Sequence, residues 1–244
     1  MMKLFRKVAV TSILFACLST TIMFNNTVFA KQQPAPDPTT PPDSVVIVLD
    51  PGHGGTDPGA STAFSDFDEK YFNLEIAKAA KAYLETTYTG VTVDLTREDD
   101  TYLSLSDRVG KAAGYNADIL VSIHNNAYDG TARGTEVWVT NNKGYKTTSA
   151  QLGELILGQI ETMADEITPE KGAVVFTKRG VKYSNYYTII NNSVKAGFPG
   201  IIIEHLFMDN YYDYQYFLSS QEKLERLGKA DALAIADYYN LELK

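Results

Sequence analysis

Two histidines stand at the ends of predicted strands, where side chains that do chemistry often lie. His53 belongs to the stretch VVIVLDPGHGG (45–55), and His124 closes the stretch ADILVSIH (117–124). The chain has only three histidines, so two of them share this placement. Neutral imidazole is the commonest metal ligand among side chains. The pair therefore favours a metal site, although a turn histidine bonded to a carbonyl oxygen is the alternative for either residue alone.

The glycine-rich turn around His53 excludes two nucleotide-binding motifs. A dinucleotide fingerprint, G-x-G-x-x-G, needs glycine where Asp57 stands, and no Gly-Lys-Ser or Gly-Lys-Thr of a phosphate loop is present. Glycines in such a turn let a ligand approach the backbone closely. Open α/β sheets bind their ligands at this place, beyond the carboxyl ends of the strands.

Two carboxylates complete the set of candidate site residues. Glu69 begins a predicted helix after the first strand, and as a third ligand it would complete a catalytic zinc site of two histidines and a carboxylate. The residues alone leave this role and that of an acid favoured by the helix dipole equally open. Glu204 lies within the apolar stretch IIIEHLF, where a carboxylate is costly unless it is received by a metal centre or an arginine such as Arg97.

His205 follows Glu204 directly, and successive side chains of a strand point to opposite faces. Only one of the two can readily face the site, and Glu204 is assigned to it. The competing assignment makes His205 the third ligand and Glu69 the base.

The elements that must position these residues alternate between strands and helices. Strands are predicted for five stretches: VVIVLD (45–50), VTVDLTR (91–97), ADILVSIH (117–124), GTEVWVT (134–140) and PGIIIEHLF (199–207). Amphipathic helices are predicted at 68–87, 104–115, 147–167 and 221–240. Several strands are apolar on both faces, which is typical of a covered parallel sheet. We therefore predict one α/β domain, with a mostly parallel twisted sheet, helices on both faces, and the metal site at the carboxyl ends of the strands.

The N-terminal segment reads as a targeting signal rather than as part of this domain. Residues 1–30 have a basic start and an apolar run that ends in Val-Phe-Ala, which predicts a signal peptide cleaved after Ala30 and a secreted or cell-envelope protein. Two asparagines interrupt the run, so no stable membrane span is expected. A lipoprotein signal ending at Cys17 is the less favoured alternative. Residues 31–44 contain five prolines and predict an extended linker, leaving 45–244 as the catalytic domain.

Charge and cysteine content exclude several classes of protein. Cys17 is the only cysteine, so no disulfide and no cysteine nucleophile are expected after cleavage. Residues 1–30 hold three basic and no acidic residues, so the rest of the chain carries a net charge of −11. Nucleic acid is therefore not expected as a partner.

Six sequence blocks, in order, resemble the zinc-dependent N-acetylmuramoyl-L-alanine amidases. The blocks are LDPGHGGTDPGA (49–60), EKYFNLEIA (69–77), LTREDDTYLSLSDRV (95–109), ADILVSIHNNA (117–127), GTEVWV (134–139) and PGIIIEHLFMDN (199–210). The resemblance implies Zn²⁺ as cofactor, with His53, Glu69 and His124 as ligands and Glu204 as the catalytic acid-base. It also implies peptidoglycan as substrate, cut between the lactyl group of N-acetylmuramic acid and the first L-alanine of the stem peptide.

The resemblance is incomplete just after Glu204. The family usually has Gly-Phe and then Ser-Asn there, whereas this chain has His205-Leu206-Phe207 and Asp209-Asn210. Two other functions remain open: a zinc peptidase that cuts within the stem peptide, and a peptidoglycan-binding module without turnover. The sequence leaves open whether a protein activator is needed.

Overall fold

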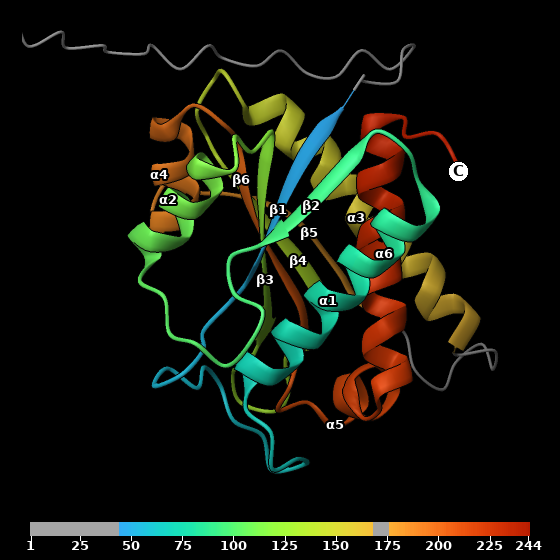
Figure 1. Ribbon diagram of the computed structural model, residues 1–244. Helices are drawn as coiled ribbons and strands as arrows, with labels where there is room; N and C mark the ends of the chain where they lie inside the picture. The colour runs from blue at the N-terminus through green and yellow to red at the C-terminus, as the bar shows by residue number, and fades with distance from the viewer. Residues whose placement is uncertain (1–43, 168–175) are drawn as a thin grey trace, which may run out of the picture.

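A six-stranded sheet forms the centre of the computed structural model, which describes residues 44–167 and 176–244 (Figure 1). The strands are β1 (Val45–Pro51), β2 (Val91–Leu95), β3 (Ile119–Asn126), β4 (Thr135–Val139), β5 (Lys178–Tyr183) and β6 (Gly200–Phe207). They lie in the order β2-β1-β3-β6-β4-β5. All neighbouring pairs are parallel except β4 and β6, which are antiparallel.

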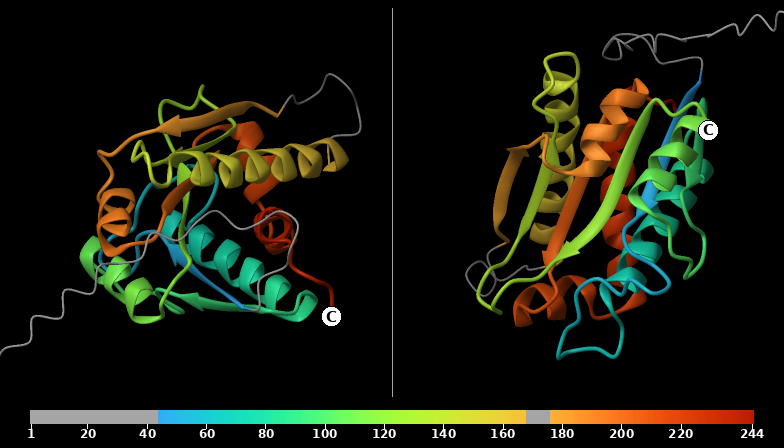
Figure 2. Two further views of the ribbon diagram at one scale, coloured as in Figure 1. Left: turned by 90° about the horizontal axis from the view of Figure 1, so that it is seen from above. Right: turned by 90° about the vertical axis from the view of Figure 1, so that its left-hand side faces the viewer.

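Helices cover both faces of the sheet (Figures 1 and 2). The helices are α1 (Glu69–Thr87), α2 (Leu105–Gly114), α3 (Lys146–Ile167), α4 (Thr188–Ala196), α5 (Tyr211–Asp213), the π-helical turn η1 (Tyr214–Leu218) and α6 (Gln221–Tyr239). Helices α1, α3 and α6 pack on one face and enclose the larger hydrophobic core. Helices α2 and α4 pack on the other face over a smaller core.

The central strands are apolar on both faces because both faces are covered. In β1, Ile47 and Leu49 point into the larger core, while Val48 between them points into the smaller one. In β3 and β6, Leu120 and Ile202 likewise face the smaller core. This alternation fixes which later residues of each strand share a face. Asp50, on the same face of β1 as Val48, accepts from Arg108 of α2 at 2.8 Å.

The structure confirms the predicted fold of one α/β domain with a mostly parallel sheet and helices on both faces. It adds two elements within 178–196 that were not predicted, β5 and α4. None of the helices in the described ranges is long and apolar enough to cross a membrane. The predicted signal peptide at 1–30 and almost all of the linker at 31–44 lie outside the described residues.

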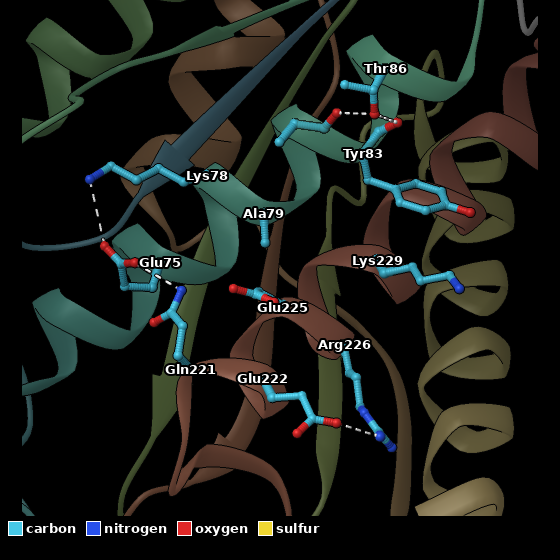
Figure 3. A pocket seen from close by; sticks show the side chains of 11 residues that line it. Glu75, Lys78, Ala79, Tyr83, Thr86, Gln221, Glu222, Glu225, Arg226 and Lys229 are labelled. Atoms are coloured by element: carbon cyan, nitrogen blue, oxygen red, sulfur yellow. Dashed lines mark hydrogen bonds and ion pairs between the residues drawn. The ribbon is translucent and has the colours of Figure 1, made fainter. Parts of the chain in front are cut away.

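Helices α1 and α6 approach each other closely at Gly228, which is buried in α6. A Cβ atom on Gly228 would lie 2.5 Å from the carbonyl oxygen of Ile76 and 2.7 Å from the Cβ of Ala79. On the solvent side, the two helices border a shallow pocket (Figure 3). Two pairs of its charged side chains lie close together, Glu75 with Lys78 and Glu222 with Arg226, and none of the candidate site residues lines it.

We expect the substitution Gly228→Ala to destabilise the domain by about 1–3 kcal/mol, because the added methyl group cannot fit against the α1 backbone. The matched control is Gly158→Ala in α3, where a Cβ would meet nothing within 4 Å. That change should stabilise by up to about 1 kcal/mol, since alanine is the better helix former. Urea unfolding of both variants measures the difference. Equal effects of the two substitutions would contradict the close contact.

Candidate metal and catalytic site

Three of the predicted site residues come together at the carboxyl edge of the sheet. His53 follows β1, His124 lies in β3, and Glu69 is the first residue of α1. His53 Nε2 lies 3.1 Å from Glu69 Oε2, and His124 Nδ1 lies 3.0 Å from Glu69 Oε1. One ligand atom from each residue can be chosen so that all lie within 4.8 Å of one another. The donor set of two imidazole nitrogens and one carboxylate oxygen suits a metal ion such as zinc.

The backbone around His53 is shaped to present its imidazole. His53 has φ 61°, a left-handed conformation that is uncommon for a residue with a side chain and marks sites under functional constraint. Gly52 before it lies against the His124 ring, and a Cβ there would come within 2.1 Å of His124 Cε1. Arg108 holds the same turn by donating to the carbonyl oxygens of Pro51 and His53 at 2.8 and 2.7 Å.

Further hydrogen bonds orient the three side chains. Asp57 Oδ2 lies 2.9 Å from His53 Nδ1, so the ring nitrogen that faces away from Glu69 has a carboxylate partner. Asn73 donates to Glu69 Oε1 at 3.1 Å, and the Ala60 amide donates to Glu69 Oε2 at 3.0 Å. Such partners fix the ring and carboxylate orientations on which metal affinity depends. Sequence reasoning missed Asp57 and Asn73, although Asn73 stands four residues after Glu69 on the same side of a helix.

The electrostatics of the cluster favour a cation. Burial lowers the pKa of His53, but Glu69 and Asp57 outweigh it through hydrogen bonds and charge and raise the pKa to about 9. Burial alone would raise the pKa of Glu69, yet the two histidines hold this pKa well below its usual range. The pKa of His124 is raised despite burial, chiefly by the Glu69 carboxylate. The ionised Glu69 thus draws positive charge, which protons or a metal ion can supply.

Glu204 lies beside His124, since the two residues are register partners on β6 and β3. Burial raises the pKa of Glu204 to about 7, and the charges of Glu69 and Glu136 add to this effect while that of His124 opposes it. Arg97, the predicted alternative partner, instead donates to backbone carbonyl oxygens of Pro51 and Gly52 at 2.9 and 2.8 Å. A carboxyl group with a pKa near 7 suits a general acid and base.

The structure contradicts the assignment of His205 as a ligand. His205 points to the opposite face of β6, is 0% exposed, and lies with Nε2 2.9 Å from Asp231 Oδ2 of α6. Its Nδ1 lies 3.2 Å from the carbonyl oxygen of His124. Strand alternation turns His205 away from Glu204. Its ring instead links α6 to the backbone of β3, the strand that carries His124.

We expect Asp231→Ala to destabilise the domain by about 3–5 kcal/mol, because it leaves the buried His205 without its partner. Asp237→Ala, at an exposed position later in α6, serves as the control and should leave stability nearly unchanged. Thermal and urea unfolding of both variants tests this. The expectation fails if the two variants unfold alike.

Asp50 and Asn126 flank the histidines in sequence but bond to neither of them. Asp50 accepts from Arg108 at 2.8 Å, Thr96 at 2.6 Å and Ser122 at 2.7 Å, all buried. Asn126 accepts from the next amide in the chain, as turn residues commonly do. Asp50 thus anchors α2 and β2 to the strand end that carries His53.

Fold and site together define an α/β protein with a cluster of two histidines and a glutamate that could hold a metal ion, and with a second glutamate, Glu204, beside it. Residues 47–237 match the family model described as N-acetylmuramoyl-L-alanine amidase. The chain therefore belongs to the N-acetylmuramoyl-L-alanine amidase family, the enzymes of cell-wall hydrolysis that its sequence blocks predicted.

Individual relatives agree with this membership. The chain is 32% identical over 198 residues to the sporulation-specific N-acetylmuramoyl-L-alanine amidase of Bacillus subtilis, a match that covers 81% of this chain and 69% of the relative. A solved N-acetylmuramoyl-L-alanine amidase from Clostridium difficile 630 has a TM-score of 0.70 at 28% identity, covering 81% and 98% of the two chains. The amidase AmiC2 of Nostoc punctiforme has a TM-score of 0.64 at 30% identity, covering 80% and 97%.

Proposed function

We propose that this chain is a zinc-dependent hydrolase of the amide bond between the lactyl group of N-acetylmuramic acid and the first L-alanine of peptidoglycan. His53, Glu69 and His124 would hold the zinc ion, and Glu204 is the catalytic acid-base. The observation that carries the proposal is the position of Glu204, one strand across from His124 and beside a cluster of three converging metal ligands.

The ligand set fits zinc in a catalytic rather than a structural role. Three protein ligands leave one position open for water or substrate, whereas structural zinc sites use four protein ligands. Zinc in such a site supplies Lewis-acid chemistry, since it lowers the pKa of water and polarises a carbonyl oxygen. The cluster contains no thiolate, so nitrogen and oxygen donors alone would hold the ion.

Glu204 would carry the proton in the reaction. Hydrolysis forms a bond from the water oxygen to the lactyl carbonyl carbon and breaks the bond from that carbon to the alanine nitrogen. Glu204 accepts the proton that the water loses and delivers it to the departing nitrogen, which leaves as a free amine. Its pKa of about 7 allows both transfers near neutral pH. General acid-base catalysis of this kind typically contributes about 10²- to 10⁴-fold in rate.

The N-terminal segments complete the proposal. Residues 1–30 would direct export and be removed after Ala30, and residues 31–44 would separate the catalytic domain from the new N-terminus. The enzyme would then act in the cell envelope or outside the cell, where peptidoglycan is accessible. The composition of 1–30 and the cell-wall activity of the relatives support this location.

The proposed bond is tested by incubating residues 31–244, loaded with zinc, with purified peptidoglycan and identifying the products by mass spectrometry. We expect free stem peptides that begin with L-alanine, together with intact glycan strands, and no release after treatment with a chelator. Cleavage between stem residues would instead establish a zinc peptidase. Binding of wall fragments without any product would contradict turnover by the zinc-loaded domain alone and leave a binding module or an enzyme that needs an activator.

A further inference from the structure

The row of polar residues at the site edge continues beyond Glu204 onto two further strands. Glu204 on β6 is the register partner of Glu136 on β4, and Glu136 bonds to Arg179 on β5. Because β4 runs antiparallel to β6 and β5 runs parallel to β4, the first residues of β4 and β5 lie at the same sheet edge as the last residues of β6. Neither Glu136 nor Arg179 has a role in the mechanism described above.

Both carboxylate oxygens of Glu136 accept hydrogen bonds from neighbouring side chains. It is 6% exposed, and its Oε1 accepts from Trp138 Nε1 at 3.1 Å while its Oε2 accepts from Arg179 Nε at 2.8 Å. Both oxygens therefore have donors, which leaves Glu136 unsuited to act as a second base. The charged hydrogen bond from Arg179 holds the guanidinium at this edge of the sheet.

The Nη1 and Nη2 groups of Arg179 donate no hydrogen bond within the described residues. Its guanidinium carbon lies 4.9 Å from the centre of the Phe207 ring, and only its Nε hydrogen bonds within the described residues. Asp213 is close enough to interact with the charge of Arg179, but the hydrogen bonds it accepts come from the amides of Phe207 at 2.9 Å and Gly134 at 2.7 Å, both to Oδ2. The Arg179 side chain is 34% exposed, so the Nη1 and Nη2 groups can meet a ligand from solvent. A fixed guanidinium with both Nη groups free matches a carboxylate, which it binds through two parallel hydrogen bonds.

We propose that Arg179 binds a carboxylate of the stem peptide, on the side of the substrate that leaves. This inference rests on the proposed function. The lactyl carboxyl of muramic acid is consumed in the amide bond, so the free carboxylates of a muramoyl peptide belong to its peptide part. Glu204 gives its proton to the alanine nitrogen. In the strand order β1-β3-β6-β4-β5, Arg179 on β5 lies beyond Glu204 on β6 as seen from His53 and His124. The geometry thus points the leaving peptide toward β4 and β5.

The test compares two synthetic muramoyl peptides, in which the second stem residue carries either a free carboxylate or its amide. Zinc-loaded residues 31–244 are assayed for kcat/KM on each, as wild type, Arg179→Gln and Arg179→Lys. Lys178→Gln is the matched control, since Lys178 is the preceding residue of β5 and lies 3.4 Å from Glu161 of α3 instead. The two stem peptides without muramic acid are also titrated into each protein by calorimetry.

We expect the wild type to prefer the free carboxylate about tenfold, mainly through KM, as a partly exposed charged hydrogen bond allows. Arg179→Gln should bring this ratio close to one, Arg179→Lys should give an intermediate ratio, and Lys178→Gln should retain the wild-type ratio. The ratio isolates substrate recognition, because a general defect in the enzyme slows both substrates alike.

Two outcomes would overturn the inference while the proposed function stands: cleavage of both substrates with no preference in the wild type, or a preference that survives in Arg179→Gln. If neither substrate is cleaved but the acidic peptide binds more tightly and only through Arg179, the carboxylate site stands and the proposed function falls. If neither cleavage nor preferential binding is found, both fall.

Discussion

Glu204→Gln should lower kcat by about 10²- to 10⁴-fold on peptidoglycan and leave the zinc content of the protein unchanged. Glutamine keeps the shape of the side chain but can neither accept the proton of water nor deliver it to the leaving nitrogen. Glu204 is not one of the three residues whose ligand atoms converge, so the ion should remain bound. The release of stem peptides, measured by mass spectrometry with zinc analysed in parallel, checks both parts.

The control for this substitution is Glu225→Gln, on the solvent-exposed side of α6 (Figure 3). It removes the same charge far from the site and should leave kcat unchanged. Full turnover by Glu204→Gln would show that another group moves the proton, and zinc lost from this variant would show that Glu204 belongs to the ligand set.

Glu69→Gln, unlike Glu204→Gln, should lower the zinc affinity of the protein itself. Glu69 is the residue that contacts both histidines, at 3.1 and 3.0 Å, so its charge attracts the ion and its oxygens align the two imidazoles. Loss of outer-shell partners alone typically costs about 10- to 100-fold in metal affinity, and a ligand should cost more than about 100-fold. Competition with a zinc-binding dye measures the affinity, and activity should fall in proportion to the zinc lost.

Glu75→Gln provides the comparison, because Glu75 lies six residues further along α1 and pairs with Lys78 on the surface. Its zinc affinity should equal that of the wild type. Should Glu69→Gln bind zinc normally yet fail to turn over, the roles of Glu69 and Glu204 would have to be exchanged.

The core of the site was accessible from the sequence because its residues follow strong local signals. His53 and His124 end two apolar strands, and parallel strands bring their carboxyl ends to one edge. Glu204 stood out as a charge within an apolar strand. His205 was correctly expected to face away from Glu204, since alternation along a strand depends on nothing but its period. The role of Glu69 needed the family resemblance, because a helix that begins with an acid is common without a metal.

The unpredicted parts depend on contacts distant in sequence. β5 reads KRGVKY and has almost no apolar alternation, because it is an edge strand that pairs only with β4. Its strand conformation is fixed by hydrogen bonds to a neighbour about forty residues earlier, a pairing without a local sequence pattern. Helix α4 is only nine residues long, too short for its periodicity to stand out among tyrosines and asparagines.

The reversed direction of β4 divides the sheet into two parts that can change independently. On one side, β1 and β3 carry His53 and His124, and their positions depend on parallel pairing through the middle of the fold. On the other side, the chain reaches the same edge through the segment 127–134 that leads into β4, whose burial is mostly low. Insertions or deletions in that segment would reshape the surface beside the site while β1 and β3, which carry the histidines, stay in place. In evolution, changes in the segment 127–134 can therefore alter which cell-wall structures bind, while the residues proposed to hold zinc keep their positions.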